Sequence, residues 1–96
     1  MVKISSGWEE KRVQILDQVA PILQDLKSVL SRFEDPEAGY FGTDAMYIRL
    51  SSRSLVIEHG TIEALLEAAK KHDAVISVDT KHGPLVVTIM KHENIF

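Results

Sequence analysis

Residues 15–33 read ILDQVAPILQDLKSVLSRF, and this stretch decides the fold. Its apolar side chains recur in alternating steps of four and three, a spacing that places them on one face of a helix. The face comprises Ile15, Val19, Ile22, Leu26, Val29 and Phe33, with Leu16, Leu23 and Leu30 beside it. A face this wide is typical of a helix that covers a sheet or a second helix. The pattern therefore predicts packing and indicates no chemistry.

We expect this helix to run from about Gly7 to Phe33. Ser6 and Glu9 have the capping-box spacing, in which each side chain accepts a hydrogen bond from the backbone amide of the other residue. Pro21 removes one backbone bond, but the apolar face keeps its phase across it. The pattern therefore predicts one long helix with a kink rather than two helices.

Residues 34–44 contain one proline, two glycines and four acids, so we expect a connecting loop, with Tyr40 and Phe41 closing one end of the core. Beyond it apolar residues alternate with polar ones, which indicates strands. The expected strands cover 46–50, 55–58, 74–79 and 85–91, and a second helix begins at Gly60-Thr61. Their inward positions are Met46, Ile48, Leu50, Leu55, Ile57, Ile76, Val78, Leu85, Val87 and Ile89.

The predicted order of elements is α-β-β-α-β-β. Residues 55–79 read as strand, helix and strand, a connection that is almost always a right-handed crossover. We therefore expect an α+β two-layer sandwich, in which a four-stranded sheet carries the long kinked helix and the shorter second helix on one face. A chain of 96 residues suits a single domain over 1–96.

The opposite face of this sheet is richer in apolar residues than a solvent-facing surface usually is. Its apolar members would be Tyr47, Val56, Val75, Val86 and Met90. This face and the wide helical face predict self-association as a homodimer, or a protein partner, through one of the two surfaces.

Composition excludes several classes of site. The chain has no cysteine, which rules out disulfides, thiolate metal sites and cysteine nucleophiles. Its net charge of −3 argues against general nucleic-acid binding, since phosphate contacts need a concentrated basic surface. A weaker alternative, a nucleic-acid accessory protein, would use Arg49, Arg53, Lys70, Lys71, Lys81 and Lys91.

We expect a cytoplasmic protein, because the first residues form no apolar signal segment and no stretch approaches the roughly 20 apolar residues of a membrane span. One asparagine, three glutamines and no cysteine would suit a thermophilic source.

A candidate anion site lies at the start of the second helix. A helix N-terminus offers free amides and a positive dipole end, and the predicted turn between the last two strands would add positive charge. The candidate residues are His59, Gly60, Thr61, Lys81 and His82. No glycine-rich phosphate motif supports this site, so a capped helix beside an exposed hairpin is the alternative.

A weaker candidate is a metal site at the other edge of the sheet, formed by His72, Asp73, His92 and Glu93. These are donor types for zinc, but no HExxH or similar motif organises them, and a histidine at a helix C-terminus is also favoured by the dipole.

The sequence therefore favours a non-enzymatic, self-associating module for protein interaction or small-ligand binding, with no cofactor. The alternative is an enzyme or sensor acting on a small anion at the second helix. Catalytic residues are not identified, because no GxSxG elbow or comparable motif is present.

Overall fold

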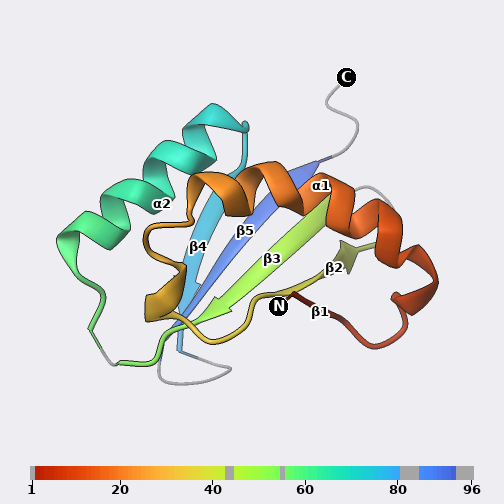
Figure 1. Cartoon of the computed structure of the whole chain (residues 1–96), viewed down its shortest axis with the longest axis horizontal. Coiled ribbons are helices and arrows are strands. Elements are labelled where there is room, and N and C mark those ends of the chain that lie inside the picture. The colour runs from red at the N-terminus through yellow and green to blue at the C-terminus, as the bar shows by residue number, and fades with distance from the viewer. Residues whose placement is uncertain (1, 43–44, 55, 81–84, 93–96) are drawn as a thin grey trace.

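The structure, a computed structural model, describes residues 2–42, 45–54, 56–80 and 85–92 (Figure 1). It is α+β, with two α-helices and a mixed sheet of five strands among those residues. The elements are β1 (Lys3–Ile4), the 3₁₀ turn η1 (Glu9–Lys11), α1 (Arg12–Asp25), the 3₁₀ turn η2 (Leu30–Arg32), β2 (Glu37–Phe41), β3 (Ala45–Ser51), α2 (His59–Lys71), β4 (Val75–Asp79) and β5 (Val86–His92). None of the described helices is long and apolar enough to cross a membrane.

The sheet has the strand order β1-β2-β3-β5-β4. β1 pairs in parallel with β2, and the other neighbours are antiparallel. Both helices lie across the same face, α1 over the middle strands and α2 on the β4 side (Figure 1). The two helices on one face match the prediction, but the sheet differs from it: β1 and β2 were not expected, and the described part of the strand expected at 55–58 is not a strand.

The core lies between the helices and this face of the sheet. The predicted helical face from Ile15 to Phe33 is buried, and it packs against alternate residues of the strands. The strand residues in the core are Ala38, Tyr40, Met46, Ile48, Leu50, Val87 and Ile89, and α2 contributes Leu65 and Ala68. The period of apolar residues thus predicted the buried faces of α1, β3 and β5.

The prediction of one continuous helix from Gly7 to Phe33 is wrong. The α-helical part ends at Asp25, and a turn leads into η2. In this turn, backbone amides bond to the carbonyl oxygen three residues earlier, as in a 3₁₀ helix. The amide of Val29, for example, donates to the carbonyl oxygen of Leu26 at 2.9 Å. Leu26, Val29 and Phe33 are nevertheless buried. The apolar spacing therefore predicted which residues face the core, but not the change from α-helix to 3₁₀ turns.

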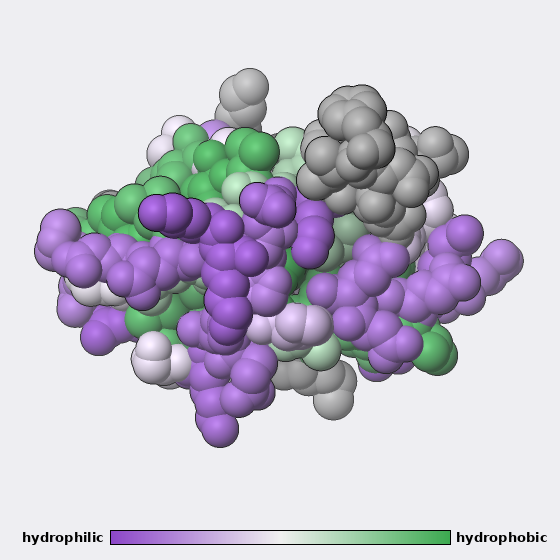
Figure 2. Space-filling view, turned by 90° about the horizontal axis from the view of Figure 1, so that it is seen from above, coloured by the Kyte–Doolittle hydropathy of each residue, from purple (hydrophilic) through white to green (hydrophobic). Residues whose placement is uncertain are grey.

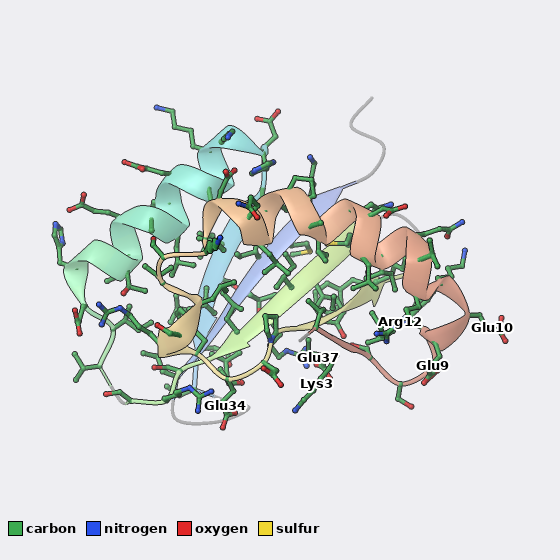
Figure 3. The ribbon with its side chains drawn as sticks, in the orientation of Figure 1. Lys3, Glu9, Glu10, Arg12, Glu34 and Glu37 are labelled. Carbon is green, nitrogen blue, oxygen red and sulfur yellow. The ribbon has the colours of Figure 1, made fainter. Side chains whose placement is uncertain are left out.

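The start of the helix also differs from the prediction. Glu9 accepts hydrogen bonds from the amide of Gly7, at 2.9 and 3.2 Å from its two carboxylate oxygens, rather than from Ser6. Glu9 belongs to η1, so its carboxylate accepts from an amide of the turn before η1 and does not cap α1. The α-helix begins later, at Arg12. In Figure 3, Glu9 and Arg12 lie at the end of the molecule away from α2.

The expected loop at 34–44 contains strand β2, which pairs with β3. Gly39 favoured the loop interpretation, but it lies opposite Tyr47 in the sheet. A Cβ atom at Gly39 would lie 2.9 Å from Ser5 Oγ and 3.0 Å from Tyr47 Oη, and these two hydroxyl groups are hydrogen-bonded to each other. Gly39 therefore leaves room for the side chain of Tyr47, which passes over it, and it does not interrupt the strand.

The expected strand at 55–58 is absent from the part of it that the structure describes, residues 56–58. β3 is already paired on both sides, by β2 and by β5, so a further strand has no place beside it. Residues 52–58 instead form the connection to α2. Of the predicted inward residues, Ile57 is partly buried on this connection and Val78 is largely exposed on the edge strand, while Leu55 lies outside the described residues.

A short strand that the sequence did not indicate completes the sheet. In β1, Lys3 pairs with Glu37 of β2 and Ile4 pairs with Ala38. Figure 3 shows the side chains of Lys3 and Glu37 close to each other at this edge. Two residues are too few for a periodicity to be detected.

Candidate functional site

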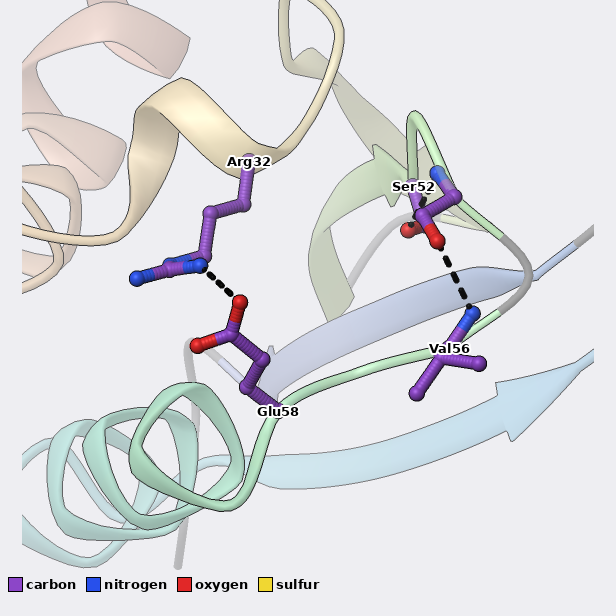
Figure 4. Close-up of polar contacts among 5 residues, drawn as sticks. Arg32, Ser52, Val56 and Glu58 are labelled. Atoms are coloured by element: carbon purple, nitrogen blue, oxygen red, sulfur yellow. Dashed lines mark hydrogen bonds and ion pairs between the residues drawn. The ribbon is translucent and has the colours of Figure 1, made fainter.

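A pocket of about 300 Å³ lies between η2, the connection 52–58 and the first turn of α2. Figure 4 shows how Arg32 on η2 faces Glu58 at the start of α2, with Ser52 and Val56 on the connection. The lining residues are Arg32, Phe33, Ser52, Arg53, Ser54, Val56, Ile57, Glu58 and Thr61.

Two guanidinium groups belong to this pocket. Arg32 is paired with Glu58, with 2.5 Å between Nη1 and Oε1, and both side chains are exposed. Arg53 donates from Nε to the carbonyl oxygen of Phe33 at 3.1 Å, a bond that does not use its two terminal nitrogens. An exposed ion pair contributes little to stability, so the pair of Arg32 and Glu58 can open at little cost.

Two serine hydroxyls line the same pocket and shape its wall. The hydroxyl of Ser52 accepts a hydrogen bond from the amide of Ser54 at 3.1 Å, and that of Ser54 accepts one from the amide of Val56 at 3.2 Å. A hydroxyl that accepts one bond still has a proton to donate. The paired turns therefore fix two potential donors while they lead the chain from β3 to α2.

The first turn of α2 is not closed by a side chain. Glu58 occupies the N-cap position with extended backbone, and its side chain makes no capping bond. The first backbone hydrogen bond of the helix runs from the amide of Ile62 to the carbonyl oxygen of Glu58, at 3.1 Å. The preceding amides form the positive end of the helix, where a negative charge is stabilised.

Thr61 is the least ordinary residue of the pocket. It is 2% exposed, and its Oγ1 has no hydrogen-bond partner among the described residues. A buried hydroxyl without a partner costs about 1–3 kcal/mol. An unpartnered buried hydroxyl in a residue that lines a pocket is a candidate ligand-binding group.

The pocket thus combines polar donors with an apolar wall. Two guanidinium groups, three hydroxyls and an uncapped helix end outweigh the single carboxylate of Glu58. Phe33, Val56 and Ile57 supply apolar surface. This chemistry fits a small anion that carries an apolar group.

Of the residues predicted to form the anion site, one lines the pocket, two are exposed, and two lie outside the described residues. Thr61 lines the pocket, but His59 is exposed and its Nε2 lies 2.5 Å from Oε1 of Glu63. Gly60 is exposed in the first turn of α2, and Lys81 and His82 lie outside the described residues.

Sequence reasoning missed Arg32, Ser52, Ser54 and Glu58 as members of one site, because the residues between 50 and 55 fall between two segments that both predict strands. The run Ser52-Arg53-Ser54 between a strand and a helix was the available signal.

The structure describes the side chains of two of the four metal candidates, His72 and Asp73. His72 donates from Nε2 to Oδ2 of Asp25 at 2.6 Å, and Nζ of Lys71 lies 3.3 Å from Asp25. The hydrogen bond from His72, aided by Lys71, lowers the pKa of Asp25 below its ordinary value of 3.8 against an opposing effect of desolvation. The described residues contain no group of three potential metal ligands. Asp73 follows the end of α2, while Glu93 and the side chain of His92 lie outside the description.

The predicted interface residues do not share one exposed surface in the single chain. Tyr47 and Val86 are buried, Met90 is half-buried, and Val56 and Val75 are exposed. Val56 lies on the connection rather than on a strand. Their contact with a partner stays a prediction.

Aromatic and charged neighbours cover Tyr47. Its ring stacks on Phe41 with 4.4 Å between centroids, and the Arg49 guanidinium lies 5.1 Å from its centroid. Arg49 also pairs with Glu37 at 2.9 Å, while Lys71 pairs with Asp25. Two of the basic residues named for the nucleic-acid alternative, Arg49 and Lys71, are thus paired with different acidic residues.

No family model, curated protein or solved structure matches this chain.

Proposed function

We propose that this chain is a non-enzymatic binding module that holds a small anion, phosphate or carboxylate on a short apolar group, in the pocket at the start of α2. The observation that carries the proposal is Thr61, a residue of the pocket lining whose buried hydroxyl has no partner among the described residues. The anion would accept hydrogen bonds from this hydroxyl and from the uncapped amides of α2.

Arg53 supplies the charge in this proposal. Its bond to the Phe33 carbonyl holds the guanidinium at the pocket while the terminal nitrogens stay outside that bond. Guanidinium groups bind phosphate and carboxylate through two parallel hydrogen bonds. Arg32 would join them when the ligand displaces Glu58 from its exposed ion pair.

Binding is favoured over catalysis because the described lining contains one carboxylate, Glu58, and no histidine or second carboxylate that could act as its acid-base partner. An enzyme acting on the same anion is the alternative, and it would need Glu58 released as a base. Turnover of a phosphate ester that disappears in Glu58→Gln would favour that alternative.

The proposal is tested by titrating the full chain with inorganic phosphate and with phenyl phosphate, followed by calorimetry and amide chemical shifts. We expect phenyl phosphate to bind more tightly, because Phe33, Val56 and Ile57 add apolar contact. The shifts should concentrate in residues 52–62. Shifts scattered over the surface would contradict the proposal.

Variants identify the binding groups. Arg53→Gln and Thr61→Val should each weaken phosphate binding roughly tenfold, as expected for one lost bond to a charged ligand. Glu58→Gln should strengthen binding, because it removes the competing carboxylate. Arg12→Gln is the matched control, since Arg12 is exposed at the start of α1, far from the pocket (Figure 3). Equal affinity in Arg53→Gln and in the control would refute the assignment.

A further inference from the structure

The two edges of the sheet are protected to very different extents. β1 forms one edge, is two residues long and carries Lys3, features that hinder pairing with another strand. β4 forms the other edge with the sequence Val-Ile-Ser-Val-Asp, and its outer side pairs with no other strand of the described chain. It contains no proline, glycine or lysine, and its one charge lies at its last residue.

Apolar side chains accompany this open edge. Val78 of β4 lies opposite the buried Val87 and belongs to the face that the helices cover, yet it is 54% exposed. The exposed apolar residues of β4 and α2 are Val75 at 59%, Val78 at 54%, Ile62 at 41% and Leu66 at 57%. Figure 2 shows apolar atoms gathered at the left of the molecule, on the side where α2 and β4 lie.

Ile62 and Leu66 extend from α2 on the side away from α1. Ala64 and Ala68 face α1, because they line a shared pocket with Asp25 and Ser28. Each residue of a helix turns by about 100°, which places Ile62 and Leu66 on the other flank of Leu65. This flank overhangs β4, against which α2 packs. We call Ile62, Leu66, Val78 and the open edge of β4 the β4 surface.

We propose that the β4 surface binds a second copy of this chain, with β4 pairing antiparallel to its counterpart and the two sheets becoming continuous. A two-fold axis through Ser77 places Ile76 opposite Val78 of the other copy. The helix-covered face of the joined sheet is then apolar across the junction, as sheet pairing of this kind requires.

The same axis also serves the helices. Leu66 lies about 7.5 Å before the end of α2 by helical rise, and Ser77 lies about 7 Å after the start of β4 by strand rise. Since the chain reverses direction over residues 72–74, Leu66 and Ser77 lie at nearly the same level. One axis therefore pairs Leu66 with its counterpart above the paired strands.

Charge complementarity favours this occupant over a foreign strand. Glu63 and Lys70 lie on the flank of α2 that carries Leu66, and they are on opposite sides of it along the helix. When two α2 helices run antiparallel about Leu66, Glu63 of each copy meets Lys70 of the other. The opposite charges then form two equivalent pairs, as a closed two-fold interface requires.

The full chain is tested by sedimentation equilibrium over a range of concentrations. We expect a reversible species of twice 10.8 kDa. Val78→Lys should raise the dimer dissociation constant roughly a hundredfold, because it places a charge in the apolar junction. Val13→Lys is the matched control, since Val13 is also an exposed valine, at 72%, but lies on α1. It should leave the dimer unchanged.

Further variants test the geometry. Leu66→Glu should also dissociate the dimer, which keeps the test valid if Val78→Lys does not fold. Glu63→Lys and Lys70→Glu should each weaken association, and the double variant should restore it. Amide exchange in β4 should be slow in the dimer and fast in dissociated variants. A wild-type monomer at high micromolar concentration would refute the proposal, as would equal dissociation in Val78→Lys and Val13→Lys.

Discussion

The two ends of α2 differ in how their backbone groups are hydrogen-bonded. At its C-terminus the backbone groups are satisfied, with the amide of Ala74 bonded to the carbonyl of Ala69 at 2.8 Å and Asp73 in the left-handed conformation. At its N-terminus no side chain caps the helix, and the hydroxyl of Thr61 is buried without a described partner. The first end resembles a Schellman motif, which completes a helix internally.

This difference separates a structural end from a candidate site. The satisfied end is also anchored to α1 by Asp25 and His72, so it fixes the angle between the two helices. The other end contains polar groups that folding alone does not need. Changes that remove contacts at the anchored end should therefore reduce stability, whereas removing the hydroxyl at the open end should increase it.

The largest expected effect lies beside the anchored end. Leu26 follows Asp25 and is fully buried. Leu26→Ala should lower the free energy of unfolding by about 2–5 kcal/mol, through lost transfer energy and a residual cavity. Denaturant unfolding measures this change. Gln24→Ala, at an exposed position on the same helix, should be nearly silent, and equal effects of the two would contradict the assigned face.

The open end should respond in the opposite direction. Thr61→Val keeps the size of the side chain and removes the unpartnered hydroxyl, so it should raise the free energy of unfolding of the ligand-free chain by about 1–3 kcal/mol. The same denaturant experiment measures it. A loss of stability would mean that the hydroxyl has a partner in the free protein, and the contrast between the two ends would fail.

The sequence predicted the buried core better than the pocket. Repeating features, such as the apolar face of α1 and the alternation in β3 and β5, report burial directly. The pocket depends on Arg32, Arg53 and Thr61, which come together only because β2 occupies the place beside β3 and forces residues 52–58 toward α2. That arrangement depended on Gly39, whose role as a space for Tyr47 is invisible without the pairing register.

A smaller effect tests the closure of the anchored end. Asp73 has φ +53°, a conformation that glycine adopts with less strain. Asp73→Gly should therefore raise the free energy of unfolding by about 0.5–1 kcal/mol, as is usual for a glycine in this position after a helix. Thermal unfolding measures the change. A loss of stability would show that the carboxylate of Asp73 has a role beyond the turn.

The smallest effect concerns the pH dependence of the anchor. Asp25 lies at the C-terminal end of α1, where the dipole disfavours a carboxylate, and the hydrogen bond from His72 nevertheless lowers its pKa. Because the folded pKa lies below the ordinary value of 3.8, the ionised group stabilises the fold above about pH 4, and this contribution is lost as the pH falls through the folded pKa.

Asp25→Asn should accordingly be less stable than the wild type at neutral pH, and the difference should shrink on acidification toward pH 2. Urea unfolding at a series of pH values measures it, with Asp17→Asn as a control on the exposed side of the same helix. A difference that stays constant with pH would show that Asp25 acts through its shape rather than its charge. The anchor between the two helices would then be a packing contact, and His72 would contribute by filling space beside α1.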